Sequence, residues 1–175
     1  GIPLTRTDAG QITLNNEDVN YLNYIQYYAD TAFDLSTANG FNWNIGGSSK
    51  VQTFNFVNTN PFPTFNYSTL NIPPSLDTSN NFTFQLDQIG NADSVFITLS
   101  RADSVAKPPF VTTRLPNNTS YYTINKSNFK KFNLNQTLNL QIELSNYNGV
   151  INSGKSYIFV NSYDYRKQIT LQGAP

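Results

Sequence analysis

The sequence contains no cysteine, no histidine and no methionine among its 175 residues. Without Cys and His, neither a Ser-His-Asp nor a Cys-His arrangement can form, so nucleophilic hydrolases of these types are excluded. A zinc site is disfavoured in the same way, because only carboxylates and amides would remain as ligands. We therefore expect no catalytic residues, no metal site and no cofactor, and a protein that is not an enzyme.

Charged residues are also scarce, and the two signs balance. Lys plus Arg number 11, Asp plus Glu number 11, and the formal net charge is zero. No net field draws such a chain to nucleic acid or to an anionic membrane. The sequence contains 26 asparagines, which we expect to replace charged residues on the surface. An uncharged, amide-rich surface suits an extracytoplasmic protein.

Long apolar runs are absent, so the chain contains neither a membrane span nor a signal peptide. It begins with Gly1 and not with Met, which predicts that an upstream segment was removed. A signal or lipoprotein leader fits that expectation. The predicted location is therefore extracytoplasmic, as a secreted protein or a cell-surface lipoprotein with a lipid anchor upstream.

What the sequence does contain is aromatic residues, 13 Phe and 11 Tyr, and apolar side chains that alternate with polar ones. Alternation with a period of two is the pattern of half-buried β-strands. Strands are expected near residues 11–14, 31–36, 41–45, 50–57, 81–87, 94–100, 110–114, 121–125, 137–145, 155–161 and 167–172.

Three segments give more specific expectations. Asn16 could cap a helix over residues 17–28, but the tyrosines there also favour a strand, so the pattern leaves helix and strand open. Asn148-Gly149 predicts a turn. Residues 157–160 are apolar at every position, which predicts a central strand covered on both faces.

The spacing of these strands predicts an all-β fold built as an antiparallel β-sandwich. The seven expected strands after Leu76 match an immunoglobulin-like sandwich in number and length. Pro73-Pro74 is a short break and not a long linker. We therefore expect residues 1–175 to form one packed unit, with an N-terminal β segment over 1–75 and the immunoglobulin-like sandwich over 76–175.

A family resemblance rests on the sequences of several strands and on their order along the chain. Asn91 to Val95 opens one strand, Tyr122 to Asn125 precedes a short turn holding Phe129, and a long amphipathic strand leads through Asn146-Tyr147-Asn148 to Gly154-Lys155-Ser156-Tyr157. With Phe41-Asn42-Trp43 ahead of it, residues 41 to 172 resemble the extracytoplasmic immunoglobulin-like domains of Bacteroidetes surface lipoproteins. The resemblance implies a location at the cell surface more than an activity.

Two groups of acidic and amide residues are candidates for chemistry. Asp30 and Asp34 would be the pair in a carboxylate-dependent hydrolase, which needs two carboxyl groups about 5–10 Å apart. Asn91, Asp93 and Asp87 supply the oxygen ligands that Ca²⁺ accepts. Asn and Asp are also common in turns, where their side chains hydrogen-bond to nearby backbone, and we favour that interpretation of Asn91, Asp93 and Asp87.

The abundance of aromatic and amide side chains favours a non-catalytic module that binds a glycan or another small ligand. Rings stack on the apolar face of a sugar, and Asn or Gln meets its hydroxyls. The candidate ligand-binding residues are Tyr147, Tyr163, Tyr165 and Trp43, although Trp43 shares its strand face with Phe41 and Ile45 and is expected in the core. The alternative is a structural or adhesive assembly module whose partner is a cell-surface protein, with a Tyr-rich strand edge at residues 21–28.

Overall fold

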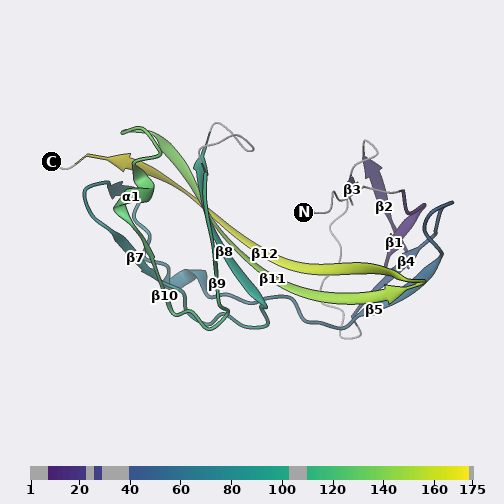
Figure 1. Ribbon diagram of the computed structural model, residues 1–175. Coiled ribbons are helices and arrows are strands. Elements are labelled where there is room, and N and C mark those ends of the chain that lie inside the picture. Colours follow the sequence, from purple (N-terminus) through teal and green to yellow (C-terminus); the bar gives the residue numbers. More distant parts are fainter. Residues whose placement is uncertain (1–7, 23–25, 29–39, 103–109, 174–175) are drawn as a thin grey trace. The chain divides into compact units, whose positions relative to one another are not determined.

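The computed structural model describes residues 8–22, 26–28, 40–102 and 110–173 (Figure 1). These residues form an all-β protein in which the chain divides into two compact units. Unit 1 contains residues 1–61 and 148–159, and unit 2 contains residues 62–147 and 160–175. The expected strand over residues 31–36 lies outside the described residues, and the packing of the whole chain as one body stays a prediction.

Unit 1 is built on one antiparallel sheet in the order β3-β2-β1-β4-β5. Its strands are β1 (Ile12–Leu14), β2 (Glu17–Leu22), β3 (Gln26–Tyr28), β4 (Phe41–Ile45) and β5 (Phe54–Asn58). The ends of two later strands, over residues 148–159, complete this unit. Tyr157 and Phe159 lie in ring contact with Phe54, Phe56 and Trp43, which projects from β4.

The helix that the sequence allowed at residues 17–28 is not found in the described part of that segment, where residues 17–22 form β2 and residues 26–28 form β3. Asn15 and Asn16 have φ of 50° and 69°, and a type I′ hairpin turn requires positive φ at both central residues. Asn tolerates that conformation well. Asn16 therefore closes the β1–β2 hairpin, in which Leu14 pairs with Glu17, and does not cap a helix.

Unit 2 is a two-layered sandwich with a five-stranded sheet, β6-β12-β11-β8-β9, and a two-stranded sheet, β10-β7. Its elements are η1 (Tyr67–Thr69), β6 (Ser75–Asp77), β7 (Phe82–Gln85), β8 (Ser94–Arg101), β9 (Phe110–Leu115), β10 (Tyr121–Ile124), α1 (Lys126–Phe129), β11 (Thr137–Asn152) and β12 (Lys155–Gln172). The order β12-β11-β8-β9 opposite β7-β10 is the G-F-C-C′ and B-E arrangement of a variable-type immunoglobulin sandwich. The predicted all-β sandwich is confirmed, with one parallel pair, β6 and β12, among its antiparallel ones.

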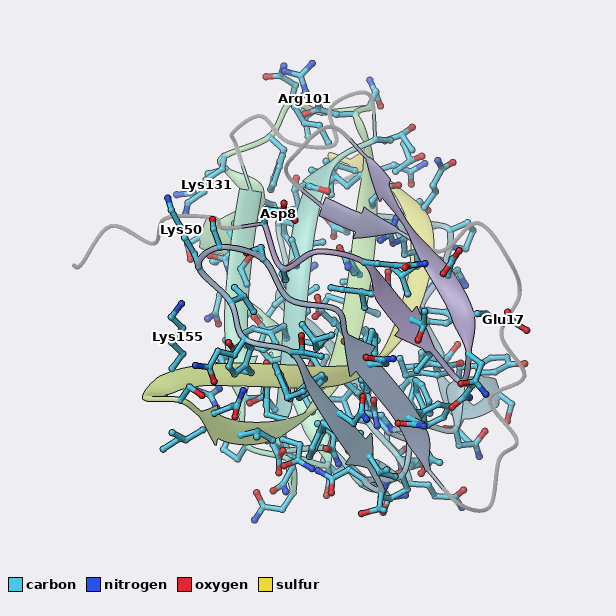
Figure 2. All side chains as sticks on the ribbon, turned by 90° about the vertical axis from the view of Figure 1, so that its right-hand side faces the viewer. Asp8, Glu17, Lys50, Arg101, Lys131 and Lys155 are labelled. Carbon is cyan, nitrogen blue, oxygen red and sulfur yellow. The ribbon has the colours of Figure 1, made fainter. Side chains whose placement is uncertain are left out.

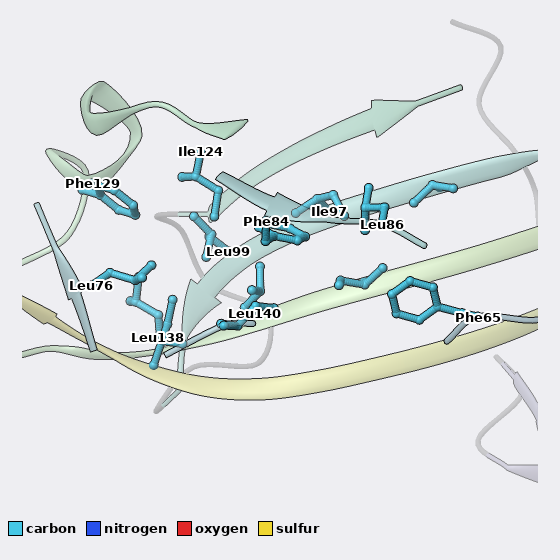
Figure 3. Close-up of a cluster of buried hydrophobic side chains, with 14 of the residues drawn as sticks. Phe65, Leu76, Phe84, Leu86, Ile97, Leu99, Ile124, Phe129, Leu138 and Leu140 are labelled. Carbon is cyan, nitrogen blue, oxygen red and sulfur yellow. The ribbon is translucent and has the colours of Figure 1, made fainter. Parts of the chain in front are cut away.

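The core of unit 2 lies between these two sheets. Figure 3 shows Phe84 of β7 and Ile124 of β10 facing Leu99 of β8 and Leu140 of β11, and all four side chains are buried. Antibody domains place a disulfide between the strands equivalent to β7 and β11. This chain has no cysteine, so apolar side chains pack in that place, and the Tyr122 hydroxyl of β10 donates across the sheets to Thr113 of β9 at 2.9 Å. Phe65 and Ile72 also belong to this core, which assigns residues 62–75 to the sandwich and not to the N-terminal segment.

The C-terminal hairpin differs from its prediction in two ways. The turn falls at Ser153-Gly154, where φ is 52° and 75°, while Asn148-Gly149 lies inside β11. Residues 155–172 form one strand and not two. A turn at Asn148-Gly149 would shorten the hairpin and remove Tyr157 and Phe159 from unit 1, so the burial of these rings favours the longer hairpin.

The segment 157–160 was predicted to be covered on both faces, and this is wrong. Phe159 is buried and Tyr157 is half-buried, but Ile158 is 69% exposed and Val160 is 46% exposed. Apolar residues at consecutive positions therefore do not indicate two covered faces here. The strand packs on one face only.

The turn that closes the hairpin gives a first prediction, a destabilisation of about 1 kcal/mol for Gly154→Ala. Gly154 has a φ of +75°, and a Cβ there would meet no atom within 4 Å. The loss is therefore conformational and not steric. Thermal unfolding should show a melting temperature lower by about 4–8 °C for a unit of this size.

Gly149→Ala is the matched control for this prediction. Gly149 lies on β11, its φ is outside the left-handed region, and its Cβ would also meet open space. Alanine there restricts the unfolded chain, so the melting temperature should stay the same or rise slightly. Equal losses in the two variants would contradict the turn assignment.

Candidate functional site

An open groove of about 410 Å³ lies in unit 2 beside strand β7. Its described lining consists of hydroxyl, amide and aromatic side chains with one proline, and none of these residues is charged. The lining residues are Thr69, Asn71, Pro73, Phe82, Thr83, Phe84, Gln85 and Tyr121. The volume falls in the range of small-molecule sites, about 300–1,000 Å³.

One wall of the groove is the outer face of the β7–β10 pair. Tyr121 lies opposite Gln85 and Thr123 lies opposite Thr83, so these four side chains share a face. The hydroxyls of Thr83 and Thr123 are hydrogen-bonded at 2.8 Å, which ties the two strands together on that face. The ring of Tyr121 is 61% exposed, so an aromatic surface is available to a ligand.

Strand β7 contributes four residues to the lining, and β10 is its one neighbour in the described sheet. The Leu86 amide donates to the carbonyl of Ser120, the residue before β10. In an antiparallel pair, the residues between such bonds direct their backbone groups away from the partner. The amides and carbonyls of Thr83 and Gln85 therefore point away from β10. The Asp87 carbonyl points the same way and accepts from the Asn66 amide, which places the segment starting at Asn66 along this edge.

The polar side chains around the groove are held in place but keep unused capacity. The Gln85 amide nitrogen donates to Asp87 at 2.5 Å, which fixes the amide and leaves its carbonyl oxygen as an acceptor. Thr69 donates to the Asn66 carbonyl at 3.0 Å. The side chains of Asn71 and Tyr121 make no hydrogen bond to another described residue. The groove thus presents donors, acceptors and a ring, with no fixed charge.

The four residues singled out from the sequence do not line this groove. Tyr163 and Tyr165 lie on one face of β12 and pack against the core of unit 2. Tyr163 contacts the ring of Phe65, and Tyr165 stacks on Tyr67 with centroids 6.0 Å apart. Burial raises the pKa of the Tyr163 hydroxyl, and the neighbouring tyrosines raise it further.

Tyr147 and Trp43 lie elsewhere. Tyr147 is 39% exposed and lies within β11, not at a loop tip. Trp43 belongs to unit 1, where its ring lies 5.6 Å from that of Phe159 and packs against the core of that unit. Tyr163 and Tyr165 therefore lie on the same face of β12. Tyr147 and Trp43 lie on other strands, β11 and β4.

The loop suggested for calcium uses its polar groups internally. A carboxylate oxygen of Asp93 accepts the Tyr147 amide at 2.8 Å, and the Asn91 carbonyl accepts from Asn146 at 2.9 Å. Among the residues that the structure describes, no group of three or more potential metal ligands of the His, Cys, Asp and Glu types is found. Asp30 and Asp34 lie outside the described residues.

Tyr121 is not among the predicted ligand-binding residues, because the alternation at residues 121–125 predicts only a strand. The signal was present in the alternation: Ile124 and Tyr122 share the inward face, so Tyr121 must point outward with Thr123. The segment carrying Thr69 and Asn71 could not be placed next to β7 from the sequence, because no periodic pattern links it to that strand.

No family model, curated protein or solved structure matches this chain. Within the described ranges, no helix has the length and apolar character needed to cross a membrane. Any assignment of function to the chain therefore rests on the chemistry of its own sites.

Proposed function

We propose that the chain is a non-catalytic binding module of the extracytoplasmic space, and that the groove beside β7 binds a neutral glycan. The observation that carries this proposal is the lining itself, in which amides, hydroxyls and an exposed ring meet in one open groove without a charged residue. Sugar hydroxyls both donate and accept hydrogen bonds, as do the Asn71 and Gln85 amides and the Tyr121 hydroxyl. The face of the Tyr121 ring is available for the C–H groups of a sugar.

An open groove suits a chain-like ligand better than an enclosed pocket would. Thr83, Gln85 and Tyr121 stand on paired strands, and the Thr83–Thr123 hydrogen bond fixes that pair. A ligand lying along β7 would therefore meet side chains that are already ordered, and would lose less free energy in ordering them.

The test is the substitution Tyr121→Ala. A glycan array of neutral oligosaccharides first identifies a ligand, and isothermal titration then gives its affinity for each variant. We expect Tyr121→Ala to weaken binding at least tenfold, which corresponds to about 1.4 kcal/mol, because the stacking surface is removed while the fold is retained.

Tyr147→Ala is the control, since Tyr147 is an exposed tyrosine outside the groove. It should leave the affinity unchanged. If Tyr147→Ala abolishes binding and Tyr121→Ala does not, the ligand binds elsewhere and the groove assignment is wrong. An array without any signal would argue against glycan binding altogether.

A further inference from the structure

A second pocket lies within unit 1, where the loop joining β4 to β5 meets the Ser153-Gly154 turn. Its volume is about 210 Å³, the space of about seven water molecules. Two lysines, Lys50 and Lys155, line it together with serine and glutamine side chains. Figure 2 shows both lysines projecting on the same side of this unit.

The walls of this pocket are held from behind by packing. Val51 is buried in the core of unit 1, and Tyr157 packs against that core with its ring 4.5 Å from that of Phe54. The loop is closed on itself by a hydrogen bond from the Ser48 amide to the Val51 carbonyl at 2.7 Å. The two lysines therefore belong to backbone segments that packing and hydrogen bonds already hold in place.

Some hydrogen-bond donors of the pocket lining are already used, and the Ser48 hydroxyl donates to the Asp8 carbonyl at 2.7 Å. The Ser153 hydroxyl donates to the side-chain oxygen of Gln52, a residue 101 positions away in the sequence. The Gln52 amide nitrogen, which carries two hydrogens, makes no hydrogen bond to a described residue. The hydroxyl of Ser49 makes no hydrogen bond to a described residue.

The lining residues of the pocket carry positive charge only, and Asp8 lies beside the loop that bears Lys50. Its described lining contains no carboxylate, and neither Lys50 nor Lys155 forms an ion pair with a described residue. Two ammonium groups, an amide nitrogen and a serine hydroxyl thus surround one small space, and all of them can donate hydrogen bonds. Such a set favours a ligand that only accepts.

We infer that this pocket binds an oxyanion, the sulfate or carboxylate group of a small ligand. Charge-assisted hydrogen bonds from the two lysines would supply the affinity, and Gln52 and Ser49 would orient the remaining oxygens. The inference is independent of the neutral groove in unit 2, from which it differs in residues and in the charge of the ligand.

The experiment titrates the protein with sodium sulfate at constant ionic strength, with chloride as the counterpart, and follows backbone amide chemical shifts. Constant ionic strength separates binding from general screening. We expect saturable shifts at residues 48–52 and 153–157. The double variant K50Q/K155Q should bind sulfate at least tenfold more weakly.

The matched control is K130Q/K131Q, which removes the same charge from two exposed lysines of unit 2. Its affinity for sulfate should equal that of the unmodified protein. Equal weakening in both double variants, or no saturable shift with sulfate or glucuronate, would overturn the proposal. Thermal unfolding checks that K50Q/K155Q is folded, and the single variants K50Q and K155Q replace it if it is not.

A second arm identifies the source of the anion by comparing glucuronate, glucose and sulfate. Tighter binding of glucuronate than of sulfate would assign the site to an acidic sugar, whereas binding of sulfate alone would assign it to a free oxyanion. Both results support an oxyanion site. Equal binding of glucose and glucuronate would overturn it, because the charge would then contribute nothing.

Discussion

Replacing Phe159 with alanine is expected to destabilise unit 1 by about 3–5 kcal/mol. The ring is 9% exposed, stacks on Phe56 at 4.3 Å and lies 5.6 Å from the ring of Trp43. Its removal leaves a cavity against two aromatic rings and forfeits their contacts. Because single domains are stable by only about 5–15 kcal/mol, this change would consume a large part of the stability of the unit.

Trp43 provides the measurement, since it is the only tryptophan in the chain and contacts the substituted ring. Urea unfolding followed by tryptophan fluorescence should show a midpoint at much lower urea concentration for Phe159→Ala. The adjacent Ile158→Ala is the control, because Ile158 is 69% exposed, and surface substitutions usually change stability by less than about 0.5 kcal/mol. A similar loss in both variants would refute the one-sided packing of β12.

Leu140→Ala is expected to cost unit 2 about 2–5 kcal/mol. Leu140 is fully buried on β11, and it pairs with Leu99 of β8 in the sheet that faces β7. Without a disulfide between the sheets, they are joined by apolar packing of this kind and by the hydrogen bond that the Tyr122 hydroxyl of β10 donates to Thr113 of β9 at 2.9 Å. The cavity left by alanine therefore weakens the contact between the two sheets.

Far-UV circular dichroism during urea unfolding measures this loss. Gln141→Ala is the control on the same strand, because Gln141 points to the opposite face, and its midpoint should change little. Ile142→Val is the milder variant for use if Leu140→Ala does not fold, with an expected loss of about 0.5–1.5 kcal/mol. A loss below about 0.5 kcal/mol for Leu140→Ala would show that the face assignment is wrong.

Most strands of this protein could be predicted from alternation, because a half-buried sheet imposes a period of two wherever one face is covered. Leu138 to Leu144 and Val95 to Leu99 follow that rule, and both sets are buried. The turn at the hairpin end could not be predicted. Asn148-Gly149 has the better turn chemistry, but long-range packing of Phe159 on unit 1 outweighs it.

The candidate sites were less accessible to prediction than the fold. Alternation assigns a side chain to a face, so it could have found Tyr121, but it does not say which segment lies beside that face. The groove needs Asn71 next to β7, and the second pocket needs Lys50 next to Lys155. Both arrangements join residues far apart in sequence, and only the tertiary structure reveals them.

The completion of unit 1 by residues 148–159 has a consequence for biosynthesis. Gln52 and its partner Ser153 are 101 positions apart, and at about 5–20 residues per second the ribosome needs roughly 5 to 20 seconds to cover that distance. During this interval Trp43, Phe54 and Phe56 have been made, but the rings that cover them have not. The nascent chain therefore exposes an aromatic sheet face that a chaperone could bind, and the first strands of the protein are among the last to be buried.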